Sequence, residues 1–280
     1  MIIENINWSD KDIFYQMALD ESLLLQAIDQ RNENVIIRFF SPSNQSITIG
    51  RSQSVADFNQ EISAKYNVEM VRRITGGRAV PHYQELTYSL IAPVKGELGG
   101  TIPESYFKIS NCLAQGLKQS GFPVEITRHE SGDKSSLSCF AARGKSEITF
   151  QEKKILGSAQ YRKQDYLLQQ GTLIYQTLPA YFDYIIPQIS GHSLIDLYHS
   201  YLKSGESELA DIIEPVNPIP SRFMIMDNIL HSFKKIFCTE MIKRNPTNRE
   251  HQTAVKLRES KYKSTVWNEN KKQAKLTIKR

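Results

Sequence analysis

The chain has 280 residues, of which 40% are hydrophobic and 23% are charged, and its formal net charge is +5 at pH 7. These proportions are ordinary for a globular protein with a sizeable core, folded as one large domain or as one domain with a helical extension. No apolar run reaches the roughly 18 residues of a membrane span and the start lacks a secretory signal, so we expect a cytoplasmic location.

The three cysteines, at positions 112, 139 and 238, do not suggest a disulfide framework, because their number is odd and their spacing is wide. No Cys-x-x-Cys or His-x-x-x-His spacing points to a structural metal, so we expect none. Free thiols fit a reducing compartment, in agreement with the expected location.

The positive charge is concentrated at the C-terminal end. From Lys243 onward there are 12 Lys and Arg residues against 3 Asp and Glu residues. We therefore expect a single domain over residues 1–242 and a basic tail over 243–280 that packs on the domain or extends from it. Such a tail could dock an acidic partner, since complementary charge speeds encounter, or it could be a solvated end.

The first element predicted in chain order is an amphipathic helix that begins near Ser9. This residue precedes an acidic first turn, as is typical of an N-cap, and apolar residues recur at helical spacing up to Ile28. The run 35–40 is rich in β-formers, ends in the turn-forming residues 41–44, and is followed by a second short run at 46–50. We expect the two runs to form a hairpin.

A turn of paired glycines comes next, between predicted strands at 68–74 and 86–91. Gly76 and Gly77 tolerate positive φ and let backbone N–H groups approach a ligand closely, so the turn could cradle a carbonyl or a phosphate. His82 follows the turn and could relay a proton or serve as a hydrogen-bonded structural group. A cationic cluster that could pair with a phosphate surrounds the turn: Arg72, Arg73 and Arg78.

The rest of the chain predicts helices around a run of short strands. A Thr-x-x-Glu capping box with proline in the first turn starts a helix over 101–121, in which Cys112 is interpreted as a core thiol. Residues 146–175 predict an antiparallel meander, and helices follow, including one at 227–237 that ends at the structural Cys238. The last twenty residues are expected to be weakly ordered.

Cys139 and Lys154 are the candidate reactive pair. Cys139 is the cysteine outside a helical apolar stripe, so it is the best candidate nucleophile, and nearby cations would raise its thiolate fraction. Lys154 precedes a stretch of small residues that lets the backbone lie close to a bound chain, Gly157, Ser158 and Ala159. Taken alone, Cys139 could also be a tolerated small residue, and Lys154 an exposed turn residue.

Together these motifs resemble the catalytic domain of the biotin and lipoyl protein ligase superfamily. The run 75–80, followed by His82 and by residues 85–89, is most similar to the cysteine-dependent octanoyltransferase branch, usually called LipM. The ATP-using ligases usually carry a third glycine where this chain has Arg78. The resemblance extends from residues 17–24 to a tail motif at 261–268, and it implies an α+β fold, with a mixed, largely antiparallel sheet flanked by helices and a helical C-terminal extension.

The resemblance also implies an activity, the transfer of octanoyl from acyl carrier protein to a lysine of a lipoyl domain, in the glycine-cleavage H protein or a dehydrogenase E2 subunit. Cys139 would carry the octanoyl group as a thioester, and Lys154 would stabilise the oxyanion. No cofactor is implied, because the phosphopantetheine on the donor is substrate, and no nucleic-acid or membrane partner is expected. The implied substrate-binding residues are Arg51, Arg73, Gly76, Gly77, Arg78, His82, Gly157, Ser158, Ala159 and Gly171.

Two departures from the family pattern concern acceptor or acyl-end contacts. Residues 141–146 lack the aromatic residue common before the glutamate that matches Glu147, and Gln170 stands where relatives usually have histidine. Four other functions stay open: an ATP-dependent lipoate ligase, a transferase between two lipoyl domains, a non-catalytic acyl-binding protein, and a cysteine hydrolase with His82 as base.

Overall fold

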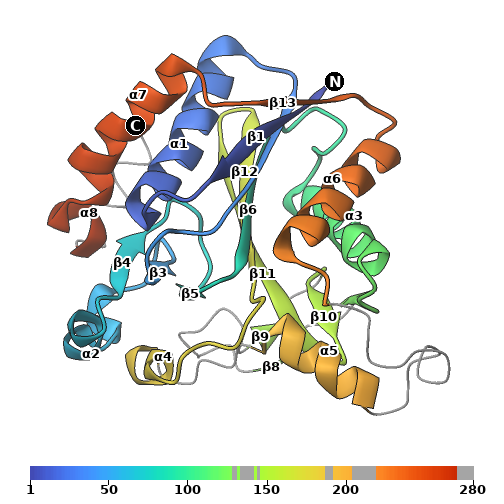
Figure 1. Ribbon diagram of the computed structural model, residues 1–280. Coiled ribbons are helices and arrows are strands. Elements are labelled where there is room, and N and C mark those ends of the chain that lie inside the picture. The colour runs from blue at the N-terminus through green and yellow to red at the C-terminus, as the bar shows by residue number, and fades with distance from the viewer. Residues whose placement is uncertain (128–130, 133–141, 144–145, 187–191, 204–218, 270–280) are drawn as a thin grey trace.

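The main feature of the fold is an eight-stranded mixed sheet with helices on both faces (Figure 1). The structure is a computed structural model that describes residues 1–127, 131–132, 142–143, 146–186, 192–203 and 219–269. The strands of the sheet follow the order β13-β1-β2-β6-β12-β11-β10-β7. Their bounds are β1 Ile3–Ser9, β2 Val35–Phe40, β6 Leu86–Pro93, β7 Glu125–Ile126, β10 Ile148–Phe150, β11 Lys153–Lys163, β12 Tyr166–Leu173 and β13 Met241–Arg244.

Most pairs in this sheet are antiparallel, and only the β1 pairs with β13 and with β2 are parallel among the strands described. The mixed, largely antiparallel sheet expected from the sequence is therefore confirmed. The meander predicted at 146–175 is also confirmed, as β10, β11 and β12. Short β-forming segments separated by turn residues are typical of antiparallel strands joined by tight turns.

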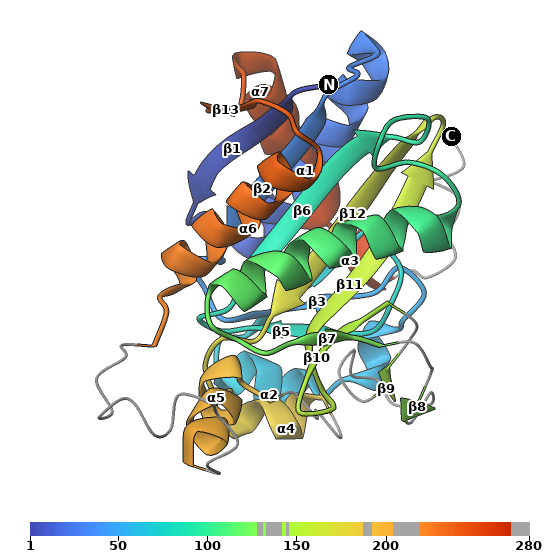
Figure 2. The ribbon, with the colours of Figure 1, turned by 90° about the vertical axis from the view of Figure 1, so that its right-hand side faces the viewer.

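Helices cover the two faces of the sheet separately in Figure 1, and Figure 2 looks onto one of these faces. On one face lie α1 (Ile13–Gln30), α7 (Asn248–Leu257), a π-helical turn (Arg258–Tyr262) and α8 (Thr265–Glu269). On the other face lie α3 (Ile102–Gln119) and α6 (Arg222–Ile236), with α5 (Leu194–Lys203) packed at its end. None of the helices described combines the length and apolar character needed to cross a bilayer.

A second, smaller sheet orders its strands β4-β3-β5 and forms one wall of the site described below. Its strands are β3 (Ser46–Ile49), β4 (Glu69–Arg72) and β5 (Val80–His82), and its outer face packs against α2 (Gln60–Lys65) and α4 (Tyr181–Ile185). A 3-10 turn lies at Val55–Asp57, and a separate pair of short strands consists of β8 (Ser131–Gly132) and β9 (Ala142–Arg143).

The predicted hairpin between residues 35–40 and 46–50 is wrong, because β2 and β3 belong to different sheets. Both edges of β2 are occupied, by β1 and β6. The turn between β2 and β3 is instead tied to α1: the backbone N–H of Ser43 donates to Lys11 O, and the Asn44 side chain accepts from the backbone N–H of Ile13. These contacts direct β3 away from β2.

The start of α1 also differs from the prediction. Ser9 ends β1, a strand that the sequence analysis missed, and the N-cap is Asp12, whose carboxylate accepts from the backbone N–H of Tyr15 over 2.8 Å. The capping box of α3 is confirmed, since Thr101 and Glu104 satisfy each other's backbone N–H groups. Cys112 is 0% exposed in the core beneath α3, as predicted.

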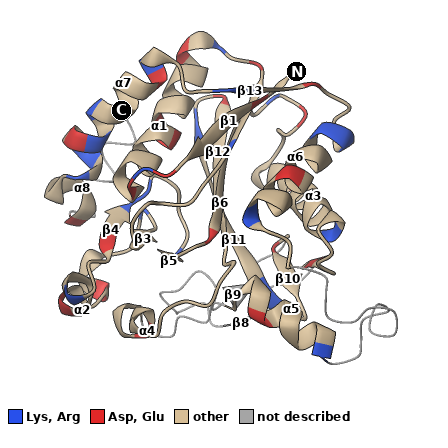
Figure 3. Cartoon of the chain, in the orientation of Figure 1, with Lys and Arg blue, Asp and Glu red and all other residues tan. Residues whose placement is uncertain are grey.

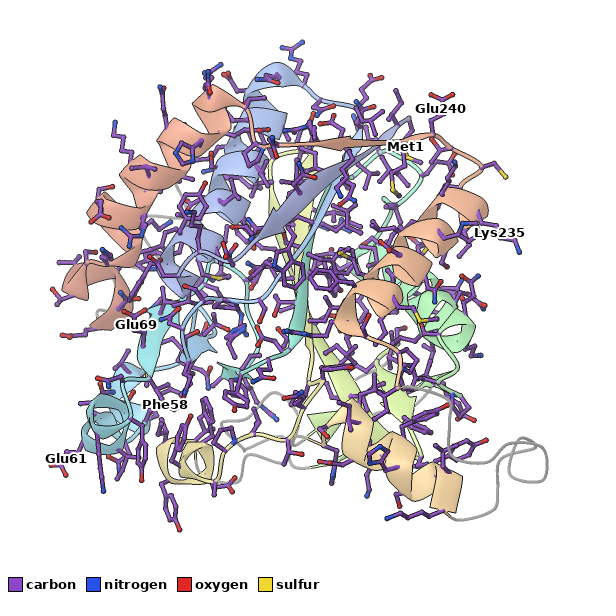
Figure 4. All side chains as sticks on the ribbon, in the orientation of Figure 1. Met1, Phe58, Glu61, Glu69, Lys235 and Glu240 are labelled. Carbon is purple, nitrogen blue, oxygen red and sulfur yellow. The ribbon has the colours of Figure 1, made fainter. Side chains whose placement is uncertain are left out.

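The basic C-terminal segment is attached to the body by charge and by a strand. The expected boundary at residue 243 falls within β13, which pairs with β1. Figure 4 shows Met1 beside Glu240, where the backbone N–H of Ile3 donates to the Glu240 carbonyl over 2.9 Å. Lys and Arg of β13, α7 and the π-helical turn pair with acidic residues of β1, of α1 and of its N-cap, and Figure 3 shows the charged residues along these elements. The ion pairs are Arg244–Glu4, Arg249–Asp29, Arg258–Asp12 and Lys261–Glu21. Basic residues of the C-terminal segment thus form ion pairs with acidic residues of the same molecule.

This attachment is expected to weaken in acid. Burial alone would raise the pKa of Glu4, but hydrogen bonds from Asn34, Asn32 and Arg244 outweigh it and hold the pKa below the usual 4.5. A carboxylate with a depressed folded-state pKa stabilises the fold above its unfolded pKa, and this contribution is lost as pH falls through the folded pKa.

We therefore expect the free energy of unfolding to fall more steeply with acidification below about pH 5 in the wild type than in Glu4→Gln. Urea titrations at several pH values measure both slopes. Equal slopes in the two proteins would show that Glu4 does not hold the C-terminal segment through its charge.

Candidate functional site

A pocket lies between the two sheets, where β3 and β5 face β11 and β12. The space open to the centre of a water molecule is about 20 Å³, so the pocket is nearly closed. Several predicted site residues meet here although they are far apart in the sequence. The lining residues are Met17, Thr48, Arg73, Val80, His82, Thr87, Gly157, Ser158, Ala159, Gln170, Gly171 and Thr172.

The glycine turn lies next to this pocket, although its glycines are not among the lining residues. Gly77 has a φ of 81°, which favours glycine, and a Cβ on it would lie 3.4 Å from the Cβ of Ala159 in β11. Gly50 is fixed by close approach, since a Cβ there would lie 1.8 Å from the Gly77 carbonyl oxygen. Around Gly76, in contrast, no described heavy atom lies within 4 Å of the Cβ position. Packing by the described residues therefore does not demand glycine at 76.

Arg72 is buried and binds backbone carbonyl groups, and it does not act as a phosphate ligand. Its guanidinium donates to carbonyl groups on both sides of the chain, those of Gly50, Arg51, Gln53, Trp267 and Asn268. Trp267 Nε1 in turn donates to Arg72 O over 2.7 Å. Burial lowers the pKa of Arg72. The C-terminal motif and the loop before the glycine turn are thus held by one side chain.

Arg73 is also buried, and it shapes the turn from inside. Its guanidinium donates to the carbonyl oxygens of Gly76 and Arg78, both over 2.7 Å, and to the Thr48 carbonyl over 2.9 Å. The cationic cluster suggested by the sequence is therefore divided, because Arg72 and Arg73 serve backbone carbonyls while Arg78 is half-buried at the turn. Arg51 lies farther out, its guanidinium 5.7 Å from the ring centre of Tyr161.

His82 is held between a hydroxyl and a carboxylate. Its Nε2 lies 3.0 Å from Thr48 Oγ1, and its Nδ1 lies 3.0 Å from Glu85 Oε1. Thr87 donates to the same carboxylate oxygen over 3.2 Å and lies 3.0 Å from the hydroxyl of Thr172. Thr48 and Glu85 were not predicted as site residues from the sequence, although the sequence shows an acidic residue three positions after a histidine.

Gln170 joins the glycine turn to a buried charge pair. Its amide donates to Asp20 over 2.5 Å and accepts from Thr75 over 2.7 Å. Asp20 lies 3.4 Å from Arg38 and accepts from Ser89 over 2.6 Å. Burial raises the pKa of Asp20, and these partners oppose the rise. An amide side chain suits this position, because the position requires a donor toward Asp20 and an acceptor toward Thr75.

Lys154 owes its orientation to a β-bulge. Thr149 pairs with Lys154 but Ile148 pairs with Leu156, so one residue of β11 is extra. Directly paired residues share a face, and Ile148 and Leu156 belong to the core beneath α3. The bulge therefore places Lys154 on the opposite face, which it shares with Gly157 and Ala159.

The Lys154 ammonium is 2.6 Å from Glu147 Oε1, and the two side chains are 3% and 11% exposed. Lys154 is thus a fixed buried cation and not an exposed turn residue. Ser158 and Gly171 contribute from the other face of their strands, where Ser158 Oγ lies 2.8 Å from Tyr88 Oη. A Cβ on Gly171 would stand 2.4 Å from the Tyr88 ring, so glycine is required there.

Cys139 lies outside the residues that the structure describes. Of the other cysteines, Cys112 is buried and Cys238 is exposed just after α6. Within the described ranges, no group of three His, Cys, Asp or Glu side chains is placed to hold a metal ion.

Comparisons with known proteins agree with the geometry. A family model for the lipoyl protein ligase A/B catalytic domain matches residues 12–216. Octanoyltransferase LipM of Moorella thermoacetica is 30% identical over 91% of this chain and 93% of that protein. Octanoyltransferase LipM of Carboxydothermus hydrogenoformans is 41% identical over 56% of this chain and 59% of that protein. A lipoate-protein ligase A bound with ATP, 17% identical, matches the fold with a TM-score of 0.71 over 95% of this chain and 98% of that one.

Proposed function

The chain belongs to the lipoyl protein ligase A/B catalytic domain family, and from this premise we propose that it transfers octanoyl from acyl carrier protein to a lysine of a lipoyl domain. The observation that carries this proposal is the similarity to octanoyltransferases over more than nine-tenths of the chain. The reaction would take place in the cytoplasm and would need no cofactor beyond the donor's phosphopantetheine, which is substrate.

The chemistry would proceed in two steps through one thioester. Cys139 attacks the octanoyl thioester of the donor and the phosphopantetheine thiol leaves; the acceptor lysine amine then attacks the octanoyl-enzyme and the cysteine sulfur leaves. Both steps place negative charge on the carbonyl oxygen. Lys154 supports this role, because it is a fixed cation on the same face of β11 as Gly157 and Ala159. Preorganised charge in a buried site needs little rearrangement during reaction.

The pocket supplies a place for the carbonyl end and the start of the acyl chain. Because no described residue crowds the Cβ position of Gly76, the thioester can approach the backbone of the turn, which Arg73 holds in place. An eight-carbon chain is far larger than the present free space, so the pocket has to widen on binding. Met17 lines the wall at this point, and its flexible, apolar side chain suits such a movement.

The proposed function is tested by mixing the purified protein with octanoyl-acyl carrier protein and an apo-lipoyl domain in the absence of ATP. We expect octanoylation of the acceptor lysine, detected by intact-protein mass, with the H protein and an E2 lipoyl domain as parallel acceptors. Product formed only from free octanoate or lipoate with ATP would contradict the proposal and favour a ligase. Faster transfer from an octanoyl-lipoyl domain than from the carrier protein would favour a transferase between lipoyl domains.

A further inference from the structure

Three side chains form a line that starts at the pocket and ends at a buried carboxylate. Thr48 and His82 both line the pocket and are each 2% exposed, while Glu85 is 1% exposed. The distances are 3.0 Å from Thr48 Oγ1 to His82 Nε2 and 3.0 Å from His82 Nδ1 to Glu85 Oε1. A hydroxyl, an imidazole and a carboxylate in this order make a chain along which a proton can pass.

The surrounding contacts are compatible with an arrangement of hydrogens that suits a relay. Arg73 donates to Thr48 Oγ1 over 3.2 Å, which leaves the hydroxyl hydrogen of Thr48 available for donation to His82 Nε2. With the imidazole hydrogen on Nδ1, His82 donates to Glu85 and accepts from Thr48. The charged groups near these three side chains are the Glu85 carboxylate, the Arg73 guanidinium and the Arg222 guanidinium. Arg222 donates to the Glu85 carbonyl over 3.2 Å.

The second step of the proposed reaction needs a base. When a lysine amine becomes an amide, its nitrogen must lose a proton. Lys154 forms an ion pair with Glu147, and an ammonium group has no lone pair to accept a proton. Of the pocket-lining side chains, His82 is the one with a basic nitrogen facing the site.

We propose that the chain of Thr48, His82 and Glu85 receives the proton of the acceptor amine during the second step. The proposal rests on the proposed function. The amine nitrogen bonds to the carbonyl carbon, the bond from carbon to the cysteine sulfur breaks, and the sulfur leaves as thiolate. The amine proton passes to Thr48 Oγ1 while the Thr48 proton passes to His82 Nε2. Glu85 pairs with the imidazolium, which afterwards returns its proton to the thiolate or to water.

The test separates the two steps. Octanoyl-enzyme is first formed with octanoyl-carrier protein and isolated, and apo-lipoyl domain is then added under single-turnover conditions. His82→Asn keeps an N–H donor for Glu85 but removes the base, and Thr48→Val removes the hydroxyl at nearly constant volume. We expect each change to slow the second step about 10² to 10⁴-fold and to slow formation of the octanoyl-enzyme much less, because the first step takes no proton from an amine.

Two further variants and a pH profile distinguish a relay from a structural contact. Thr48→Ser keeps the hydroxyl and should keep the rate of the second step. Ser46→Ala removes another buried hydroxyl of β3, outside the pocket, and should change neither step. In the wild type the second step should slow on acidification, because an imidazole that already holds two protons cannot accept another. His82→Asn should lose the part of this dependence that comes from the imidazole, and should keep the slowing, common to both proteins, that comes from protonation of the acceptor amine.

The outcomes differ from those of the proposed function itself. Equal slowing of both steps in His82→Asn and Thr48→Val, or an unchanged second step, would overturn the relay while the octanoyl-enzyme still formed. Failure of the wild type to form any octanoyl-enzyme would overturn the proposed function, and the relay with it. Circular dichroism and thermal unfolding of each variant show whether the fold is kept, and Thr48→Ser against Thr48→Val decides the matter if His82→Asn does not fold.

Discussion

Replacing Cys139 with serine is expected to abolish the hydroxylamine-labile octanoyl adduct and to reduce transfer to the background rate. A thiolate attacks a thioester far more readily than a hydroxyl does, because a serine hydroxyl stays protonated at neutral pH unless a base removes its proton. Incubation with octanoyl-acyl carrier protein, followed by intact mass with and without hydroxylamine, measures the adduct directly.

The two other cysteines provide the controls. Cys112 lies in the core beneath α3, and burial raises its pKa to about 12, so its thiol is inert at neutral pH. Cys238 is exposed and follows α6, a helix that contributes no residue to the pocket lining. Cys238→Ser and Cys112→Ala should therefore both keep the adduct. An adduct that persists in Cys139→Ser, or that disappears only in Cys238→Ser, would refute the assignment.

Local patterns in the sequence predict the elements that depend on near neighbours. The capping box of α3 and the meander of β10, β11 and β12 each involve residues a few positions apart, and both are confirmed. The core position of Cys112 follows from helical spacing alone. The residues that determine each of these features lie within one helical turn or one hairpin of each other.

Pairings between distant segments were not predictable in the same way. β1 pairs with β13 although more than two hundred residues separate them, and no local pattern of either strand specifies the partner. The hairpin expected between β2 and β3 is wrong for the same reason, since adjacency along the chain was the only available guide. The face on which Lys154 lies depends on a bulge, whose position follows from strand pairing and not from the residues of β11 alone.

The candidate site contains residues that the sequence alone identifies and residues that only the folded structure identifies. His82 and the glycines are visible in the sequence because their residue types carry chemistry, and the structure brings His82, Gly157 and Ala159 to one pocket. Thr48 and Asp20 gain their place only through contacts across the fold. Arg72, whose residue type suggested a phosphate, instead satisfies backbone carbonyls, which only burial could reveal.

Replacing Lys154 with methionine is expected to slow formation of the octanoyl-enzyme about 10² to 10³-fold, the usual cost of removing one group that stabilises an oxyanion. The change also leaves Glu147 without its cation. Because Glu147 is only 11% exposed, we expect a loss of about 3 to 5 kcal/mol in the free energy of unfolding as well. Rapid-quench mass measurements of the adduct and urea unfolding quantify the two effects.

A second substitution separates catalysis from stability. In the double variant Lys154→Met with Glu147→Gln the buried carboxylate is gone, so most of the stability should return while adduct formation stays slow. Lys153→Met is the matched control, because Lys153 is the exposed neighbour in β11, and it should change neither quantity. If the double variant forms the adduct at the wild-type rate, the Lys154 ammonium does not act on the carbonyl oxygen. Its role would then be confined to neutralising Glu147 inside the fold.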